Sequence, residues 1–158
     1  MIDNRETIKI SIDTLGSETS IANIIKGLNT SFLRNDNYFF RLFGPKEKLN
    51  YELKKFSTLK ENVEIIDCNE FVEMTDKPSE AMKTKKNSSM FKSIISILET
   101  DSKAVLSCGN TGALMAISLL NLKTLDTIKR PAIASIWPNV IGESIVLDLG
   151  ANIKSDSQ

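Results

Sequence analysis

Short apolar segments with a two-residue period alternate with segments of helical period along this chain of 158 residues. Ile8, Ile10 and Ile12 are separated by polar residues, which predicts a strand. Apolar residues at helical spacing follow between Ile21 and Phe32, so a strand, a loop and a helix are expected in this order. Strands that alternate with helices favour a parallel sheet with helices on both faces. The pattern therefore predicts the α/β class.

The same alternation continues along the chain. Further strands are predicted at residues 38–43, 63–67, 104–107, 131–137 and 144–149, and further helices at residues 45–56, 70–74, 90–98 and 113–122. Residues 113–122 are apolar on nearly every side, so this helix is expected to be buried. The lysine-rich segment 77–87 is interrupted by Pro78 and is expected to be a loop. No repeat or linker divides the chain, so residues 1–158 are predicted to form a single α/β domain.

No helix is predicted after the last strand, at residues 144–149. A parallel sheet without helices on one face leaves apolar surface bare. The fold is therefore expected to be incomplete at its C-terminus, or to lean on a partner.

Composition excludes several classes of function. The chain has 20 basic and 20 acidic residues, so no global positive field attracts nucleic acid or an anionic membrane. It has no histidine, which removes the commonest general base and the commonest metal ligand. Its two cysteines make neither a disulfide framework nor a zinc site, and the polar residues 1–7 do not resemble a signal peptide. A reduced, cytoplasmic globular protein that needs no metal or other cofactor is expected.

Three glycine-bearing turns follow predicted strands, at residues 13–18, 108–112 and 150–152. In open α/β sheets ligands gather at the carboxyl ends of the strands, and glycine lets backbone NH groups approach an anion closely. The second turn joins an apolar strand to an apolar helix, and Asn110 and Thr111 add side-chain donors to it. Each turn alone also fits a plain connection between a strand and a helix, and none has the spacing of a nucleotide-binding loop.

Lysines and serines precede the helix predicted at residues 90–98. Lys85 and Lys86 come just before Ser88 and Ser89, at the expected start of that helix. Two ammonium groups beside a helix N-terminus could hold phosphate. Without the surrounding turns, a solvated loop is the favoured interpretation of these lysines.

Four further residues beside the predicted turns could carry chemistry. Asp13 and Asp148 each end a strand before a glycine turn, where a carboxylate either orients a substrate or caps the turn. Arg130 precedes a predicted strand and either clamps an anion or lies on the surface. Cys108 stands where a helix N-terminus could lower the pKa of a thiol, but no histidine exists to activate it. A small core residue is the favoured interpretation of Cys108.

Several segments, in their order and spacing, resemble the bacterial phosphate acyltransferase (PlsX) family. They are DKPSEA at 76–81, KKNSSM at 85–90, SCGNTGALM at 107–115, RPA at 130–132 and LDLGAN at 147–152. The resemblance runs from about residue 8 to residue 152. The first loop departs from it, because the family usually has Asp-Ala-Met-Gly-Gly-Asp where residues 13–18 read DTLGSE. Ser17, in place of a glycine, is expected to disturb a turn that needs a positive φ.

The resemblance implies a phosphotransacetylase-like fold, a three-layer α/β/α sandwich with a mostly parallel sheet, of which this chain is the N-terminal portion. It implies an acyltransferase that forms acyl phosphate from fatty acyl-ACP, the thioester of acyl carrier protein, and inorganic phosphate in phospholipid biosynthesis. Acyl carrier protein, phosphate, a second copy in a homodimer and a membrane glycerol-phosphate acyltransferase are the expected partners, and nucleic acid is not. The complete protein is expected at the inner face of the membrane, with the sheet and the acyl pocket completed beyond this chain.

Such a reaction asks little of acid–base groups, because phosphate is already an anionic nucleophile at neutral pH and a thioester is activated. Positioning and preorganised donors should suffice, which suits a chain without histidine. The predicted catalytic residues are Asn110, Thr111 and Asp148, and the predicted phosphate- or substrate-binding residues are Asp13, Gly16, Lys85, Lys86, Ser88, Ser89, Gly109, Gly112, Arg130 and Asn152. Replacing Asn110 with Ala in a complete homologue is predicted to lower turnover with little change in melting temperature.

Three alternatives stay open. A related phosphate acyltransferase could use acyl-CoA in place of acyl-ACP. A truncated, non-catalytic chain could act only as an interaction partner or subunit fragment, which fits the departures in the first loop. A nucleotide-binding module is disfavoured, because the fingerprint spacing is missing.

Overall fold

The computed structural model describes residues 6–128 and 131–147, which fall into two compact units. The first unit, Met1–Leu122, contains four strands and six helices among its described residues, and the second, Lys123–Gln158, contains two strands. The expected single domain over residues 1–158 stays a prediction. Each unit is described by itself.

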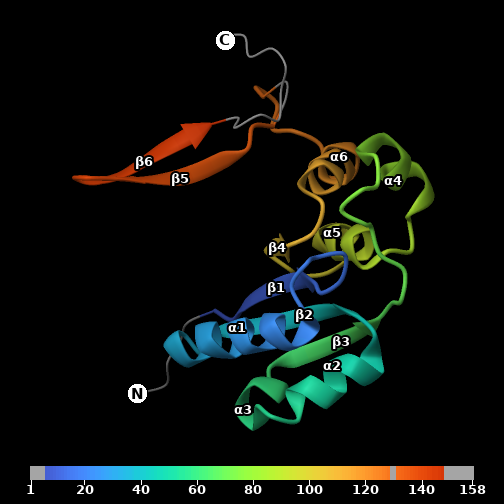
Figure 1. Cartoon of the computed structure of the whole chain (residues 1–158), viewed down its shortest axis with the longest axis vertical. Helices are drawn as coiled ribbons and strands as arrows, with labels where there is room; N and C mark the ends of the chain where they lie inside the picture. Colours follow the sequence, from blue (N-terminus) through green and yellow to red (C-terminus); the bar gives the residue numbers. More distant parts are fainter. Residues whose placement is uncertain (1–5, 129–130, 148–158) are drawn as a thin grey trace. The chain divides into compact units, whose positions relative to one another are not determined.

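The first unit alternates strands and helices as the sequence predicted (Figure 1). Its strands are β1 (Ile8–Asp13), β2 (Tyr38–Gly44), β3 (Val63–Asp67) and β4 (Ala104–Ser107), and its helices are α1 (Ile21–Arg34), α2 (Lys46–Leu53), α3 (Ser57–Lys60), α4 (Pro78–Thr84), α5 (Ser89–Glu99) and α6 (Thr111–Leu122). The strands pair in parallel in the order β3-β2-β1-β4. The prediction of an α/β fold with a mostly parallel sheet between helices is confirmed.

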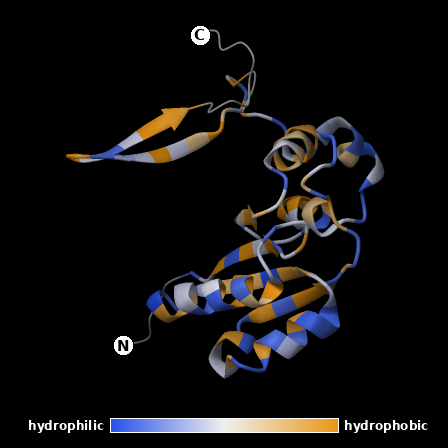
Figure 2. Ribbon diagram, viewed as in Figure 1, coloured by the Kyte–Doolittle hydropathy of each residue, from blue (hydrophilic) through white to orange (hydrophobic). Residues whose placement is uncertain are grey.

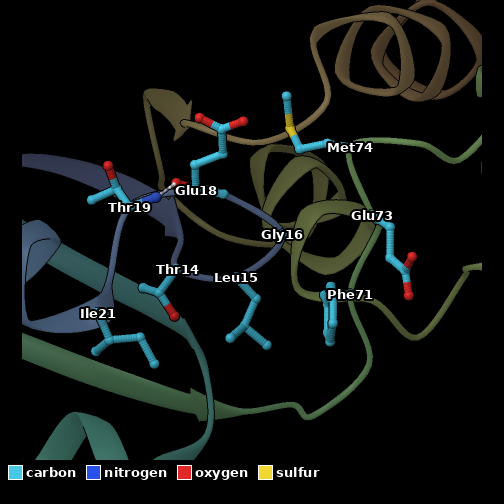
Figure 3. Close-up of a pocket in the computed structure, with 10 residues that line it drawn as sticks. Thr14, Leu15, Gly16, Glu18, Thr19, Ile21, Phe71, Glu73 and Met74 are labelled. Atoms are coloured by element: carbon cyan, nitrogen blue, oxygen red, sulfur yellow. Dashed lines mark hydrogen bonds between the residues drawn. The ribbon is translucent and has the colours of Figure 1, made fainter.

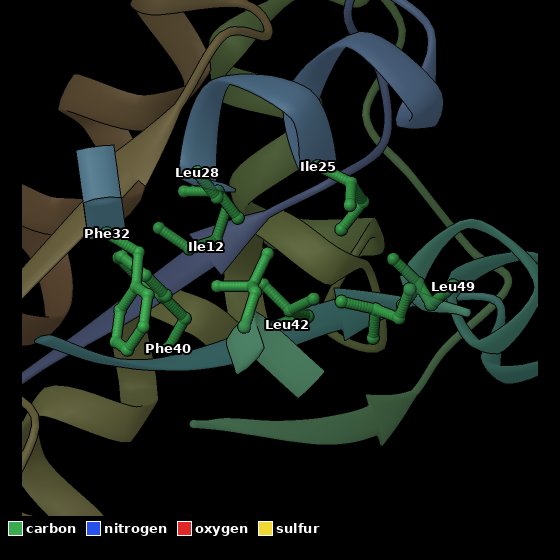
Figure 4. Close-up of a cluster of buried hydrophobic side chains, with 9 residues drawn as sticks. Ile12, Ile25, Leu28, Phe32, Phe40, Leu42 and Leu49 are labelled. Atoms are coloured by element: carbon green, nitrogen blue, oxygen red, sulfur yellow. The ribbon is translucent and has the colours of Figure 1, made fainter. Parts of the chain in front are cut away.

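The sheet has one apolar face, on the side of α1 and α2. Figure 2 shows hydrophilic and hydrophobic residues alternating along β1, whereas β2 is hydrophobic over most of its length. Ile12 and the β2 residues Phe40 and Leu42 point to the side of α1 and α2, and each is at most 2% exposed. They pack with Ile25, Leu28, Phe32, Leu49, Leu53 and Leu59 in one buried cluster (Figure 4). Burying each such side chain stabilises the fold by about 1.5–3 kcal/mol, so this cluster anchors the sheet.

The opposite face of the sheet meets α5 through polar side chains. The Ser11 hydroxyl lies 2.6 Å from the Ser96 hydroxyl and donates to Ser102 at 2.9 Å. Arg41 donates to Ser102 at 2.8 Å and pairs with Glu64 at 2.8 Å and Asp101 at 2.9 Å. Because the buried hydroxyls of Ser11, Ser96 and Ser102 satisfy one another, the polar layer holds α5 in one register on the sheet. A second apolar cluster continues on the far side of α5 and joins it to α4 and α6.

Two local predictions were wrong. Residues 70–74 were expected to be helical, but they form an irregular connection whose backbone is held by contacts from distant residues. Residues 77–87 were expected to be a loop, but Pro78 begins α4. Proline is favoured in the first turn of a helix, where its missing NH group leaves no hydrogen bond unmade.

Helix α6 is less buried than its composition predicted. Ala113 and Ile117 are fully buried against α4 and α5, whereas Leu119 is 41% and Leu120 59% exposed. The expectation of burial on all sides was therefore wrong for this chain. Among residues 6–128 and 131–147, no helix combines the length and the apolar character needed to cross a membrane.

The second unit holds an antiparallel pair, β5 (Ala134–Asn139) and β6 (Gly142–Leu147). Two strands were predicted here, at residues 131–137 and 144–149, and two are present with shifted bounds and a turn at residues 140–141. Residues 148–149 lie outside the described residues. The pairing of β5 with β6 is antiparallel, as a two-residue hairpin connection requires. The apolar side chains of Ile136, Trp137 and Ile145 are each more than half exposed on this hairpin.

Candidate functional site

Two of the three predicted glycine turns lie side by side at the carboxyl edge of the sheet. Strands β1 and β4 are adjacent and parallel, with Asp13 level with Ser107, so the turns that follow them leave the sheet together. A Cβ atom placed on Gly109 would lie 3.5 Å from the carbonyl oxygen of Gly16 and 3.1 Å from the Met90 side chain. The turn at 13–18, the turn at 108–112 and the start of α5 therefore converge on one place.

A single carboxylate connects the two turns. Asp13 is 2% exposed and accepts hydrogen bonds from the Ser107 hydroxyl at 2.7 Å and from the Leu15 backbone NH at 3.3 Å. Ser107 in turn accepts a bond from the backbone NH of Gly109 at 3.1 Å. Asp13 thus fixes the first turn directly and the second turn through Ser107.

Burial raises the pKa of Asp13 above its usual value, and this effect exceeds the opposing influence of Ser89, Ser107 and the Leu15 NH group. The Ser89 hydroxyl is fully buried near this carboxyl and favours its charged form, but the arrangement falls short of hydrogen-bond geometry. Within the described residues the Ser89 oxygen has no hydrogen-bond partner.

Ser88 has a different role: it caps α5, accepting from the Phe91 NH at 3.2 Å and donating to the Lys85 carbonyl at 2.6 Å.

The raised pKa of Asp13 makes the stability of the protein depend on pH in a testable way. Because its folded-state pKa is raised above 3.8, the folded protein takes up this proton at a higher pH than the unfolded chain. The contribution of Asp13 to stability therefore falls as the pH rises from 3.8 through the folded-state pKa. We expect the stability of Asp13→Asn relative to the parent protein to be greater at pH 7 than at pH 4, by urea unfolding. Asp101, with a pKa lowered to about 2 by Lys9 and Arg41, is common to both proteins and cancels. An equal difference at both pH values would contradict the argument.

The side chain of Asn110 is occupied by structural hydrogen bonds. Its carbonyl oxygen accepts from the Ala113 NH at 3.0 Å and caps α6. Its amide nitrogen lies 3.2, 3.2 and 2.9 Å from the carbonyl oxygens of Glu73, Met74 and Asp76. Asn110 is only 8% exposed, so it positions the start of α6 and the segment 73–76 and does not present its amide to solvent.

Gly16 makes the contact between the first turn and residues 71–74. Its φ is +71°, and an added Cβ would lie 2.2 Å from the carbonyl oxygen of Val72. Both features require glycine. Ser17 was expected to disturb a positive-φ turn, but the positive φ belongs to Gly16, and the Ser17 hydroxyl accepts a bond from the Thr19 NH at 2.8 Å. The departure from the family pattern at Ser17 is therefore accommodated.

A cavity of about 400 Å³ opens between these two segments (Figure 3). It is lined by residues 14–19, Ile21, Phe71, Glu73 and Met74. In Figure 3, Leu15, Ile21 and Phe71 project to one side of the backbone at Gly16, whereas Glu18 projects to the other. Sequence reasoning missed Phe71, Glu73, Met74 and Ser107. Ser107 alone carried a signal, because it ends a strand beside a glycine turn.

The structure describes four of the other predicted residues: Thr111, Gly112, Lys85 and Lys86. Thr111, the first residue of α6, is exposed, and a Cβ on Gly112 would approach Pro78 of α4 to 2.8 Å. Lys85 is half-buried and Lys86 is exposed, in the connection between α4 and α5. Arg130, Asp148 and Asn152, with the third glycine turn, lie outside the described residues.

The two cysteines lie in different environments, one exposed and one buried. Cys108 was interpreted as a core residue, but it is exposed beside the second turn. Cys68 is buried, and burial raises the pKa of its thiol to about 11. Among the residues placed by the structure, no three carboxylate or thiol side chains gather closely enough to hold a metal ion.

The N-termini of α5 and α6 adjoin the two turns. The Ser89 NH at the start of α5 already donates to the Glu70 carbonyl and the Phe91 NH to the Ser88 hydroxyl, so the start of α6 is the part of this edge that suits a negatively charged ligand. A parallel sheet with glycine turns and helix N-termini at one carboxyl edge defines an α/β protein with a ligand site at that edge.

Comparison with known proteins identifies the family. The family model described as "Fatty acid synthesis protein" matches residues 8–158. The phosphate acyltransferase of Pelagibacter ubique is 44% identical over 147 residues, covering 93% of this chain and 44% of that relative. Those of Ruegeria sp. and Mesorhizobium japonicum are 40% and 43% identical, covering 99% and 95% of this chain and 42% of each relative. The chain belongs to this phosphate acyltransferase (PlsX) family, and it spans less than half the length of these relatives.

Proposed function

We propose that this chain supplies part of the active site of an acyltransferase that forms acyl phosphate from fatty acyl-ACP and inorganic phosphate for phospholipid biosynthesis. Family membership supports the phosphate acyltransferase class. The description of the family by fatty acid synthesis supports a fatty acyl donor. The choice of acyl carrier protein over coenzyme A as the carrier is part of the proposal.

The observation that carries this proposal is the joining of two glycine turns by Asp13. The carboxylate is bonded to Leu15 in the first turn and, through Ser107, to Gly109 in the second. One fixed group therefore sets the relative position of both turns beside the N-termini of α5 and α6. Preorganised NH donors of this kind stabilise developing negative charge without reorganising during the reaction.

The proposed reaction needs positioning more than proton transfer. A phosphate oxygen attacks the thioester carbonyl carbon, and the electron pair of the carbonyl moves to its oxygen. NH groups at the start of α6, around Thr111 and Gly112, stabilise this oxyanion, and Lys85 and Lys86 lower the repulsion between the two anionic reactants. The carbonyl re-forms as the carbon–sulfur bond breaks, giving acyl phosphate and a thiolate that takes a proton from water. Asn110 acts as a positioning residue, because its amide already bonds to residues 73–76.

The remaining parts of the proposal concern partners and location. We place the complete enzyme in the cytoplasm at the inner face of the membrane, as a homodimer that receives acyl carrier protein and passes acyl phosphate to a membrane glycerol-phosphate acyltransferase. Arg130 and Asn152 are proposed to bind phosphate or substrate, and Asp148 is proposed as a catalytic residue that orients a loop or a substrate group. The neutral overall charge, with 20 basic and 20 acidic residues, makes nucleic acid an unsuitable partner.

A chimera tests the function directly. We would replace the matching segment of the Pelagibacter ubique relative, which is 44% identical, with this chain and measure acyl phosphate formed from palmitoyl-ACP and radiolabelled phosphate. The chimera is expected to form acyl phosphate with a rate within about tenfold of the parent relative, because the segment supplies an equivalent site.

Two controls test the choice of acyl carrier and the proposed function itself. A parallel reaction with palmitoyl-CoA separates the two carriers, and a higher rate with the coenzyme A thioester would overturn the choice of acyl-ACP. A chimera with native circular dichroism that forms no acyl phosphate from either donor would refute the proposed function of the chain.

A further inference from the structure

The cavity between the first turn and residues 71–74 has a predominantly apolar lining. Its volume, about 400 Å³, falls within the range of small-molecule sites. Leu15, Ile21, Phe71 and Met74 supply its large apolar side chains. Phe71 is 39% and Met74 50% exposed, so apolar surface faces water at this place. A ligand that covered this surface would be bound through the hydrophobic effect.

The charges around the cavity specify what kind of ligand fits. Among the lining residues, the ionisable side chains are Glu18 and Glu73, which are both exposed, and no lysine or arginine joins them. Two carboxylates repel phosphate and free fatty acids alike. The cavity therefore suits an uncharged apolar group, and the anionic reactant must bind elsewhere along the edge.

The walls of the cavity are fixed by specific contacts. Gly16 lies against the Val72 carbonyl in a position that any Cβ would block, and Asn110 bonds to the backbone of Glu73 and Met74. Because a Cβ on Gly109 would lie 3.5 Å from the carbonyl oxygen of Gly16, the cavity adjoins the turn that is proposed to bind the anionic reactant. A preformed apolar cavity beside an anion-binding turn matches a ligand with a hydrocarbon tail and a reactive carbonyl.

We propose that this cavity binds the hydrocarbon chain of the fatty acyl donor next to its thioester. The inference rests on the proposed function and adds the place at which the acyl group is held. The chain had been expected to lack the acyl pocket, so this assigns to Leu15, Ile21, Phe71 and Met74 a role that the sequence did not indicate.

Binding of uncharged thioethers to the full 158-residue chain tests the proposal without turnover. The probes are S-butyl-, S-octyl- and S-dodecyl-pantetheine, measured by isothermal titration calorimetry without phosphate. Affinity is expected to rise at least about tenfold from the butyl to the dodecyl probe, because each methylene removed from water adds to binding. Equal affinities for the three probes would overturn the proposal.

Matched variants locate the binding. Phe71→Ser and Met74→Ser each remove an exposed apolar side chain from the cavity, and Leu33→Ser removes one that is 73% exposed on α1. The first two are expected to weaken S-dodecyl-pantetheine binding at least about fivefold, and the third to leave it unchanged. Equal effects of all three, in variants that keep the parent circular dichroism, would refute the assignment to this cavity. Since both cavity residues are exposed, at least one variant should fold.

A variant that removes a charge distinguishes binding of an uncharged acyl-chain analogue from binding of a free fatty acid. Glu73→Gln removes one of the two carboxylates at the cavity while its backbone bond to Asn110 remains available. It is expected to strengthen binding of laurate about threefold and to leave S-dodecyl-pantetheine unchanged. If the probes bind as expected while the chimera described above makes no acyl phosphate, the apolar site stands and the proposed reaction fails. The reverse outcome would remove the site and keep the reaction.

Discussion

Replacing Gly16 with Ala is expected to lower the free energy of unfolding by about 3–5 kcal/mol. The backbone at this position has a φ of +71°, which strains any residue with a Cβ by about 1–3 kcal/mol. The new methyl group would also lie 2.2 Å from the Val72 carbonyl oxygen, so one of the two loops must move. Urea unfolding followed by circular dichroism measures the loss.

Gly27→Ala is the matched control for this experiment. Gly27 lies within α1, it is exposed, and no atom lies within 4 Å of an added Cβ. Alanine in a helix interior is favoured over glycine by about 0.5–1 kcal/mol, so this variant should be slightly more stable than the parent. A Gly16→Ala protein that is as stable as Gly27→Ala would show that the first turn does not press against Val72.

The same substitution connects stability to the cavity. Gly16 lines the cavity, and an added Cβ would press on the carbonyl of Val72, the residue after the lining residue Phe71. Relief of this clash would move apart the segments that carry Leu15 and Phe71. We expect the affinity for S-dodecyl-pantetheine to fall in Gly16→Ala under conditions where the variant is still folded. The free energy of unfolding and the affinity for the probe are expected to fall together, because both depend on the close contact between Gly16 and the Val72 carbonyl.

The sheet was predictable because its signals are local. The two-residue alternation of Ile8, Ile10 and Ile12 already indicates which side of β1 is apolar, and the structure packs Ile12 with Phe40 and Leu42 on that side. Ser88 stands at the expected start of a helix, and it caps α5. Signals of this kind survive folding, because neighbouring residues supply both the pattern and the contacts.

The cavity was not predictable, because distant residues shape it. Residues 70–74 look helical in isolation, but Asn110 binds their carbonyl oxygens from 36 and 37 positions along the chain. No sequence pattern within residues 70–74 predicts these hydrogen bonds from Asn110. The position of the positive φ was missed for a similar reason: the contact with Val72 selects Gly16, while Ser17 lies in ordinary backbone. Long-range contacts of this type override local propensity.

Replacing Asn110 with Ala is expected to lower both stability and turnover. The variant loses the cap on α6, worth about 1 kcal/mol, and leaves the carbonyl oxygens of residues 73–76 without their donor, at a further cost of about 1–3 kcal/mol. A fall in melting temperature of about 10 °C follows, contrary to the small change predicted from the sequence. In the chimera, acyl phosphate formation should fall by about 100-fold, because the turn and the cavity wall both shift.

Asn110→Ser divides the two roles of this side chain. Serine can still cap α6 by accepting from the Ala113 NH, but it is too short to hold residues 73–76. We expect it to recover about 1 kcal/mol of the stability lost in Asn110→Ala and to recover little of the turnover. Full recovery of turnover would show that the cap alone matters, and that the bonds from Asn110 to Glu73 and Met74 do not position the reacting groups. Turnover unchanged in Asn110→Ala would remove the residue from the site altogether.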